Sequence, residues 1–277
     1  KEMKDYVMFS FELYKNNPYW IPPIIAEELE TFDKTKNPAL QTAEAHFYLA
    51  YKDNKIVGKI AAIINWEEVN LLGKRKARFG WFDAIDDIEV TKALLDKVEE
   101  LGRKHNMDHM EGPMGFSNLD KVGILSEGFD QMGNMITWYS LPYYITHFEQ
   151  LGFIKEKEYI ESDFSFNGIN PEPFQKASEL IKKRYELRSL NFTKTKDIMP
   201  YVDKMFDLFN ETYARLQSFV PINDIQKEYF KKKYIGFINP EFIKFIVDKN
   251  DNMIAFAIVM PGFAQALKKA NGKLFPF

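Results

Sequence analysis

A glycine and a lysine near the end of the chain are the residues best suited to hold a phosphate group. Gly272 and Lys273 follow AQALKKA, residues 264–270, which has the composition of a helix. A glycine lets a phosphate approach the backbone closely, and a lysine adds positive charge. The same residues are also typical of the C-terminal end of a helix. Two hypotheses stay open: Gly272, Lys273 and Leu274 bind the phosphates of a cofactor, or they only end a helix.

The histidines and the absence of cysteine give no support for a metal centre or a thiol nucleophile. His105 and His109 share the i, i+4 spacing of zinc ligands, but they lie on either side of the expected end of a helix. With no cysteine in the chain, disulfides and thiolate chemistry are excluded. The sequence also contains no G-x-S-x-G elbow, Walker loop or G-x-G-x-x-G motif. We therefore expect no metal site.

One compact group of basic residues lies between two expected strands: Lys74, Arg75, Lys76 and Arg78. A solvated loop is the simplest interpretation of such a group. The alternative is contact with an acidic ligand that carries a phosphate group.

The overall composition excludes several classes of partner. The 277 residues are 45% hydrophobic and 28% charged, with a formal net charge of -3. So small a net charge creates no field that would attract nucleic acid or an anionic membrane. No apolar run approaches the roughly 20 residues that cross a bilayer, and the first residues lack the order of a signal peptide. We expect a soluble cytoplasmic protein of two domains that binds small molecules.

Apolar periodicity in the first half of the chain predicts helices separated by strands. Val90, Leu94, Val98 and Leu101 fall on one face of a helix over residues 87–105. The other elements expected here are a helix at 3–14, strands at 77–85 and 108–112, a loop of about two dozen residues, a short helix before Gly152, and two strands within 153–166.

A β-hairpin is expected over residues 47–66, where two β-rich runs flank a turn at Asp53 and Asn54. Gly58 lies within the second run. A glycine in a strand indicates a bulge or a close backbone approach.

The second half of the chain begins with a linker at residues 167–173 and continues with two helices. The first starts near Pro173. The second covers about 197–216, with a stripe that we interpret as core. The residues of this stripe are Val202, Met205, Phe206, Phe209, Tyr213 and Leu216.

An internal repeat organises the chain into two units. Residues 242–262 repeat the earlier hairpin in shape, with an apolar run, a Lys/Asp/Asn turn and a second apolar run. Each hairpin follows a proline-containing approach, IPPII in one case and INPEF in the other. We place the units at residues 1–166 and 167–277. The second stops short of a full repeat, so we expect either a truncated domain or a half-domain that completes the first.

The order of elements resembles that of the GNAT superfamily of acyl-CoA N-acyltransferases. AYKDNKIVGKIAAI is similar to the central hairpin of that family, and HFEQLGF, residues 147–153, is similar to its helix ending in L-G-F. The resemblance covers residues 47–165 and, in part, 240–277. It implies an α+β fold, a mixed sheet flanked by helices, with a second, partial GNAT-like unit.

The resemblance places the pyrophosphate of acyl-CoA at the start of the helix at 87–105. Members of the family normally have a glycine-rich loop there, whereas this sequence has Asp86, Asp87 and Glu89. Carboxylates at this position cap a helix and repel a dianion. We therefore expect the first unit not to bind CoA in the usual way, and the donor to lie at Gly272, Lys273 and Leu274.

The family's usual general acid is a tyrosine four residues before the glycine of L-G-F, and Phe148 occupies that position here. Tyr143, Tyr144 and His147 lie close enough to substitute, although all three also suit packing at a sheet edge. The resemblance further suggests Glu127 as a base, with Glu111, Asp130 and Asn118 as neighbouring polar groups. These seven residues are Tyr143, Tyr144, His147, Glu127, Glu111, Asp130 and Asn118.

The function implied by the resemblance is transfer of an acyl group from acyl-CoA, acetyl-CoA by default, to the amine of a small molecule. Acyl-CoA would be a cosubstrate, and no permanent cofactor is expected. The alternative is a degenerate GNAT-fold protein that binds a ligand or a partner without chemistry. A third hypothesis is a protein that binds long acyl chains, which the 25 Phe and 14 Tyr suggest.

Overall fold

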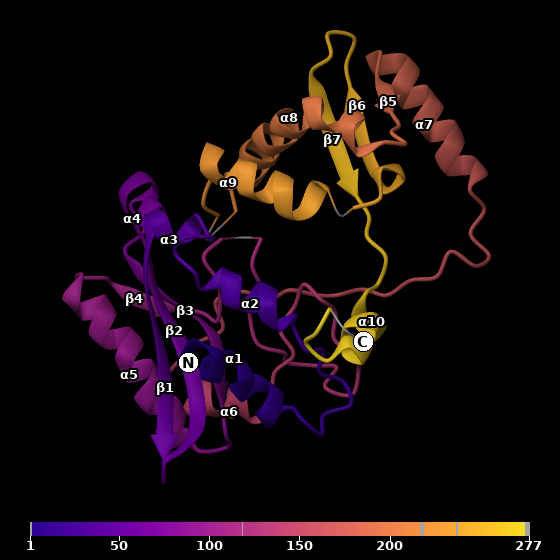
Figure 1. The fold of residues 1–277 in the computed structure, drawn as a ribbon. Coiled ribbons are helices and arrows are strands. Elements are labelled where there is room, and N and C mark those ends of the chain that lie inside the picture. The colour runs from indigo at the N-terminus through magenta and orange to yellow at the C-terminus, as the bar shows by residue number, and fades with distance from the viewer. Residues whose placement is uncertain (1, 118, 217–218, 237, 275–277) are drawn as a thin grey trace. The chain divides into compact units, whose positions relative to one another are not determined.

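The computed structural model describes residues 2–117, 119–216, 219–236 and 238–274, and these residues form two compact units (Figure 1). Unit 1 contains the chain up to Ile154 and the segment from Gly262 onward. Unit 2 contains Lys155–Leu216 and Pro221–Pro261. The contacts thus divide the chain some twelve residues earlier than the sequence suggested, and they group the last helix with unit 1.

Unit 1 is built around a mixed four-stranded sheet in the order β1-β2-β3-β4. β1 (Ala43–Lys52), β2 (Lys55–Asn65) and β3 (Lys76–Ala84) are antiparallel, and β4 (His109–Glu111) pairs parallel to β3. The expected mixed α/β class is therefore confirmed. The connection between β3 and β4 contains the helix α5 (Ile88–Lys104). Two adjacent parallel strands require a long crossover connection of this kind.

Helices cover both faces of this sheet (Figure 1). α5 and α6 (Tyr143–Gln150) pack against Ile60, Ala62 and Ile64 of β2. α1 (Glu2–Leu13) packs on the opposite face, against Ala61 and Ile63. Successive side chains of a strand point to opposite faces, so a central strand covered on both sides is apolar throughout. The remaining helices of unit 1 are α2 (Ile25–Thr31), α3 (Ala39–Thr42), α4 (Trp66–Leu72) and α10 (Ala264–Ala270).

The β1–β2 hairpin confirms the prediction made from its turn residues. Asp53 and Asn54 adopt φ values of 51° and 63°, the left-handed pair that a two-residue hairpin turn needs. The register of the pair shifts opposite Val57, and a Cβ on Gly58 would lie 2.8 Å from Leu94 Cδ1. Gly58 therefore lies beside a bulge and also lets α5 approach the sheet closely.

β3 contains a second bulge. Ala61 pairs with Gly80 and Lys59 pairs with Asp83, so Trp81 and Phe82 together face one residue of β2. Trp81 has φ 46°, a left-handed conformation that is rare for a bulky side chain and is found most often at functional sites. Bulges are common next to active sites because they redirect side chains.

Replacing Gly80 by alanine should destabilise unit 1. A Cβ at this position would lie 2.3 Å from the carbonyl oxygen of Met114, and backbone cannot yield as a flexible side chain can. We expect a loss of about 1–3 kcal/mol, typical of overpacking, measured by thermal unfolding followed by circular dichroism. Gly262→Ala is the control, because nothing lies within 4 Å of its added Cβ. Equal melting temperatures for the two variants would contradict this close packing.

The two strands expected within residues 153–166 are not formed, and that prediction was wrong. This segment has no regular secondary structure, and Ile154, Ile160, Phe164 and Phe166 are exposed. A β-rich sequence becomes a strand only where a neighbouring strand accepts its hydrogen bonds. β4 pairs with β3 over three residues only, so it is a short strand against which residues 153–166 could pair.

Unit 2 holds an antiparallel three-stranded sheet in the order β5-β6-β7. Its strands are β5 (Arg188–Leu190), β6 (Ile243–Val247) and β7 (Met253–Ile258), and its helices include α7 (Glu172–Tyr185), α8 (Thr195–Tyr213) and α9 (Asp224–Phe230). A π-helix at Lys231–Ile235 and a 3₁₀ turn at Pro240–Phe242 follow α9. The expected hairpin and helices are confirmed, and the α8 stripe is core at Val202, Met205 and Phe206.

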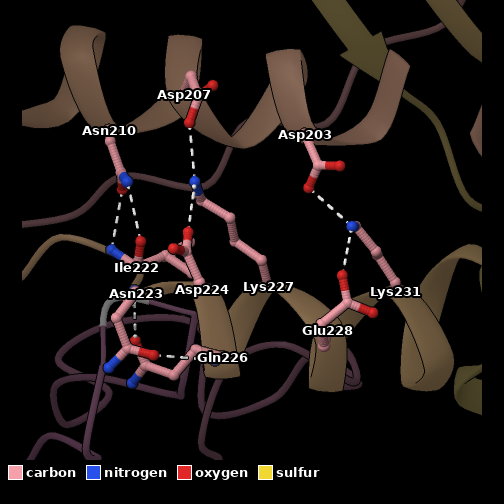
Figure 2. Close-up of polar contacts among 10 residues, drawn as sticks. All are labelled: Asp203, Asp207, Asn210, Ile222, Asn223, Asp224, Gln226, Lys227, Glu228 and Lys231. Atoms are coloured by element: carbon pink, nitrogen blue, oxygen red, sulfur yellow. Dashed lines mark hydrogen bonds and ion pairs between the residues drawn. The ribbon is translucent and has the colours of Figure 1, made fainter. Parts of the chain in front are cut away.

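Two lysines fix α9 and the turn after it against α8 (Figure 2). Lys227 Nζ lies 2.8 Å from Asp207 and 3.1 Å from Asp224. Lys231 Nζ lies 2.7 Å from Asp203 and also contacts Glu228. Because both lysines and both α8 aspartates are spaced by four residues, the pairs repeat at one helical turn. These contacts set the register between the two segments.

The two hairpins that suggested an internal repeat are each followed by a short helix. In each copy a seven-residue helix follows the hairpin, α4 after β2 and α10 after β7. Each helix then turns through a left-handed glycine followed by lysine: Gly73 with φ 66° and Gly272 with φ 81°. Gly272 and Lys273 thus correspond in structure to Gly73 and Lys74.

Candidate functional site

Asp83 is the centre of a buried polar cluster in unit 1, two residues after the bulge at Trp81. Its carboxylate accepts hydrogen bonds from Ser10 Oγ at 2.7 Å and from Tyr14 Oη at 2.8 Å, both on or just after α1. Lys59 Nζ, also buried, lies 3.6 Å from the same carboxylate. A buried carboxylate needs such partners to compensate for its lost hydration.

Tyr144, a residue predicted from sequence, belongs to this cluster. The backbone N–H of Ala84 donates to Tyr144 Oη at 3.0 Å, and the hydroxyl lies 3.3 Å from both Asp83 Oδ1 and the Ala84 carbonyl. Tyr143 Oη donates to that carbonyl at 2.7 Å. α6 therefore attaches to the end of β3 through two phenols. Burial, together with the negative charge of Asp83, raises the pKa of Tyr144 well above its usual value.

Tyr6 adds a hydroxyl that no described residue satisfies. Its side chain is 2% exposed, and its Oη has no hydrogen-bond partner among the described residues. The ammonium of Lys59 lies over the Tyr6 ring, 5.0 Å from its centroid. Burial is the main cause that raises the pKa of Tyr6. A buried phenol without a partner costs free energy, and such groups are often retained for a ligand.

Lys121 lies in the loop after β4, and the charges of Lys59 and Asp83 both influence its pKa. Burial lowers the pKa of Lys121, and the nearby charge of Lys59 acts in the same direction. Glu28 and Asp83 act in the opposite direction. No described residue forms a hydrogen bond or ion pair with this ammonium.

The cluster should delay the titration of several tyrosines. Burial raises the pKa of each of its three phenols and of the adjacent Tyr143. At about pH 11 we expect the ultraviolet absorbance of the native protein to show that at least four of its 14 tyrosines are still protonated. Denaturation at the same pH should ionise these tyrosines. Above about pH 10 the unfolded state binds fewer protons than the folded state, so stability falls as pH rises. Tyr14→Phe should lower the count by one. An unchanged count would contradict the burial of this phenol.

His147, the second predicted catalytic residue, is buried on α6 about one turn beyond Tyr144. Its Nδ1 lies 2.9 Å from Thr91 Oγ1 and its Nε2 lies 3.2 Å from Asp86 Oδ1. These contacts join α6 to the first turns of α5 and to the β3–α5 connection. Both ring nitrogens are thus engaged, with Thr91 and Asp86 and not with Asp83. A catalytic role for His147 stays a prediction.

The predicted acidic residues are dispersed. Glu127 and Asp130 are exposed in the loop between β4 and α6, and Glu111 pairs with Lys76 at 2.5 Å. Asn118 lies outside the described residues. Of the predicted catalytic residues that the structure describes, Tyr144 alone contacts Asp83, and the role of Glu127 stays a prediction.

The start of α5 has the capped form expected from its carboxylates. Asp87 is the N-cap and accepts a hydrogen bond from the Glu89 N–H at 3.1 Å. Lys52 pairs with Asp87 at 2.9 Å, and this pairing lowers the pKa of the Asp87 carboxyl. A carboxylate therefore occupies the position at which a helix start would bind a phosphate.

The three residues predicted to bind the donor lie at the end of α10. The Ile25 N–H donates to the Gly272 carbonyl at 2.9 Å, and Gly272 packs on Phe11 so closely that a Cβ would lie 2.7 Å from its ring. Lys273 and Leu274 are exposed. Gly272 therefore lies at the end of α10 and packs closely on Phe11. Donor binding by Gly272, Lys273 and Leu274 stays a prediction.

Two of the four residues in the basic group are buried, so the solvated-loop interpretation is wrong for them. Lys76 and Arg78 belong to β3 and are 3% and 1% exposed. Both pair with the buried Glu68 of α4, Lys76 at 3.0 Å and Arg78 Nε at 2.8 Å. Arg78 also donates to the Gly115 carbonyl at 3.2 Å. β3 can include Lys76 and Arg78 because acidic partners compensate for the burial of these two charges.

Sequence reasoning missed most of the Asp83 cluster. Its members come from α1, β2, β3 and α6, and Ser10 and Asp83 are 73 positions apart. The one available signal was an aspartate and a lysine inside two apolar strands, at positions 83 and 59. Charges in a buried strand indicate a paired or functional site.

Comparisons with known proteins give distant relatives that align with the whole of this chain and with about 70% of their own length. No family model matches the chain. The whole chain aligns with Protein YghO of Escherichia coli (strain K12), at 27% identity over 281 residues and 70% of that protein. It also aligns with a bacterial ceramide synthase of Caulobacter vibrioides, at 24% identity over 279 residues and 71% of that protein.

Two solved structures are similar to parts of the fold. One is a tandem GNAT protein from the clavulanic acid biosynthesis pathway, with TM-score 0.44 and 11% identity, covering 94% of this chain and 70% of that one. The other is a probable acetyltransferase, with TM-score 0.33 and 12% identity, covering 60% of this chain and 91% of that one.

The described residues contain neither a candidate membrane-spanning helix nor a candidate metal centre. No helix in that part of the chain is long and apolar enough to cross a membrane. Within the same residues, no three His, Asp or Glu side chains converge as metal ligands would.

Proposed function

We propose that this chain transfers an acyl group from acyl-CoA to an amine, with the Asp83 cluster of unit 1 as the reaction site. The observation that carries the proposal is the buried, unpartnered hydroxyl of Tyr6 beside Lys59 and Asp83. Similarity of the whole chain to 71% of a protein named a bacterial ceramide synthase supports it, because a ceramide is a long-chain amide. The GNAT resemblance of the sequence points to the same reaction class.

The cluster can serve the chemical needs of this reaction. Attack of an amine on a thioester carbonyl places negative charge on the carbonyl oxygen, which preorganised donors stabilise. Tyr6 supplies an O–H that no described residue uses. Asp83 is held by Ser10, Tyr14 and Lys59, so it fixes the cluster rather than reacting. Tyr144, whose raised pKa keeps it protonated, is the proton donor to the leaving thiolate.

The acceptor that we propose is a long-chain amine or amino alcohol. This follows the name of the Caulobacter relative and the abundance of aromatic residues, 16% of the chain. Acetyl-CoA and a long-chain acyl-CoA are both candidate donors, and both belong in the test.

The test mixes the protein with acetyl-CoA or palmitoyl-CoA and with either a short diamine or a long-chain amino alcohol. Amide product is measured by mass spectrometry, and released thiol is measured with a chromogenic reagent. We expect amide and thiol in equal amounts, and Tyr6→Phe should lower kcat about 100-fold or more, as loss of an oxyanion donor does. Tyr51→Phe is the control, because Tyr51 is 59% exposed. Absence of amide with every pair would overturn the proposal.

Calorimetric titration with the same donors tests the binding residues separately. If Gly272, Lys273 and Leu274 hold the phosphates of the donor, Lys273→Ala should weaken binding at least several-fold. Unchanged affinity would place the phosphates elsewhere and leave this segment as a helix end.

A further inference from the structure

Lys59 is a buried lysine whose ammonium donates no hydrogen bond to any described residue. Its side chain is 4% exposed, and the one described acid within ion-pair range, Asp83, lies 3.6 Å away, which is beyond hydrogen-bond distance. An ammonium carries three donors, and burial removes the water that they would otherwise bind. Lys59 is therefore a buried cation with unused donors.

Tyr6 offers a second unused donor beside this ammonium. Lys59 Nζ lies over the Tyr6 ring, 5.0 Å from its centroid. Tyr6 is 2% exposed, and its Oη has no hydrogen-bond partner among the described residues. Burial raises the pKa of Tyr6, so the phenol keeps its proton and acts as a donor. Two buried donors without acceptors thus lie together, one on α1 and one on β2.

The groups around this donor pair leave it without an acceptor. The Asp83 carboxylate already accepts hydrogen bonds from two hydroxyl groups, at 2.7 and 2.8 Å. The Tyr6 ring packs on Phe32 and Phe47, whose ring centroids lie 5.4 and 5.7 Å from its own. Aromatic rings provide an apolar wall that suits an acyl chain and no oxygen that could accept a hydrogen bond. The donor pair therefore fits the carbonyl oxygen of a largely apolar ligand.

The helix beside Tyr6 is lightly packed. None of the residues of α2 is buried, and Phe32, directly after this helix, lies over both Tyr6 and Trp81. Elements with few buried contacts open locally at low free energy. Local opening of α2 would give an acyl group access to the two donors.

We propose that Lys59 is a catalytic residue that, together with Tyr6, donates hydrogen bonds to the thioester carbonyl oxygen during acyl transfer. As the amine nitrogen bonds to the carbonyl carbon, the π electron pair moves onto the oxygen, and the two donors stabilise its negative charge. The C=O bond then re-forms, and the carbon–sulfur bond breaks with its electron pair on sulfur.

The protons move through other groups in this scheme. Tyr144 protonates the sulfur and regains a proton from water, the amine proton passes to water, and Lys59 gives up no proton. The assignment rests on the proposed function, which used Tyr6 as the only donor to the oxyanion.

Kinetics test the assignment. Lys59→Met should lower kcat about 100-fold or more and change KM little, because an oxyanion donor acts on the transition state more than on the bound substrate. Lys55→Met, which removes an exposed lysine at the start of the same strand, should match the wild type. Wild-type kcat in Lys59→Met overturns the assignment.

A double variant separates a catalytic lysine from a mere counter-ion of Asp83. Lys59→Met/Asp83→Asn removes both charges and keeps an oxygen acceptor for the hydroxyls of Ser10 and Tyr14, so we expect it to fold, which thermal unfolding checks. Asp83→Asn alone keeps Lys59 and is the matched control. It should be at least about 10-fold more active than the double variant. Equal activity of the two variants makes Lys59 a counter-ion only.

Infrared spectroscopy gives a readout without turnover. The probe is an acyl-CoA analogue with a methylene group in place of the sulfur and an isotope-labelled carbonyl, which transfers no acyl group. Hydrogen bonds from Tyr6 and Lys59 should lower the carbonyl stretching frequency of the bound probe below that of the free probe. Lys59→Met should reverse part of this shift, and Lys55→Met should not.

The outcomes of this measurement separate the two levels of the proposal. If folded Lys59→Met binds the probe with the wild-type frequency, the donor role of Lys59 is overturned and the proposed function is untouched. If the wild-type protein does not bind the probe, acyl-CoA is not its donor, and the proposed function fails together with the assignment.

Discussion

Replacing Glu68 by leucine should lower the free energy of unfolding by about 3–5 kcal/mol, the typical effect of removing one partner from a buried ion pair. Glu68 is 1% exposed and is the carboxylate shared by Lys76 and Arg78. Without Glu68, Lys76 would keep its ion pair with Glu111, and Arg78 would keep its hydrogen bond to the Gly115 carbonyl. Two buried cations would then share a single carboxylate. Denaturant unfolding monitored by circular dichroism measures the loss.

Asp96→Leu is the matched control, since it also removes a paired acid from a helix. Asp96 bonds Lys92 at 2.7 Å, but both side chains are about half exposed, at 51% and 53%. Exposed pairs contribute roughly 0.2–1 kcal/mol. If Glu68→Leu and Asp96→Leu destabilise the protein equally, the Glu68 network is not buried as described.

Replacing Asp83 by leucine should have an effect of similar size, about 3–5 kcal/mol, for a different reason. Lys59 would lose its carboxylate, and the hydroxyls of Ser10 and Tyr14 would lose their acceptor. Each hydroxyl left unsatisfied in a buried place adds about 1–3 kcal/mol of desolvation cost, less what rearrangement recovers. Acyl transfer should also be abolished, because the cluster would no longer be held together.

The double variant Lys59→Met/Asp83→Leu distinguishes a charge effect from a packing effect. Replacing both members of a buried ion pair by apolar residues is often neutral or stabilising relative to breaking the pair. We therefore expect the double variant to be more stable than Asp83→Leu alone, measured in the same denaturant series. A double variant that is less stable than either single variant would show that packing, and not the unpaired ammonium, dominates.

Local pattern was sufficient for the elements of unit 1 that position the site. The turn residues Asp53 and Asn54 predicted the hairpin, and the apolar face of residues 87–105 predicted α5. These predictions succeed because turn geometry and helical periodicity are local properties. The segment 153–166 failed for the opposite reason: its strands needed a partner that the chain beside it does not provide.

The charged residues were harder to predict because their burial depends on distant partners. Lys76 and Arg78 form a basic run in the sequence, and only Glu68, together with the loop after β4, shows that they are buried. Tyr144 was found through its place near L-G-F. Lys59, Asp83 and Lys121 belong to no sequence motif. The environment of each side chain depends on residues dozens of positions away.

The bulge at Trp81 changes which residues of β3 face each side of the sheet. Before it, the odd-numbered Ala77 and Phe79 pack on the α5 side of the sheet; after it, the even-numbered Phe82 and Ala84 do so. Odd-numbered Trp81 therefore joins the core on the α1 side, and Asp83 meets Ser10 and Tyr14. If the same sequence paired with β2 without the bulge, every residue after Gly80 would change face, and the Asp83 carboxylate would point into the apolar layer beneath α5. A single extra residue thus decides which layer of the protein receives the charge.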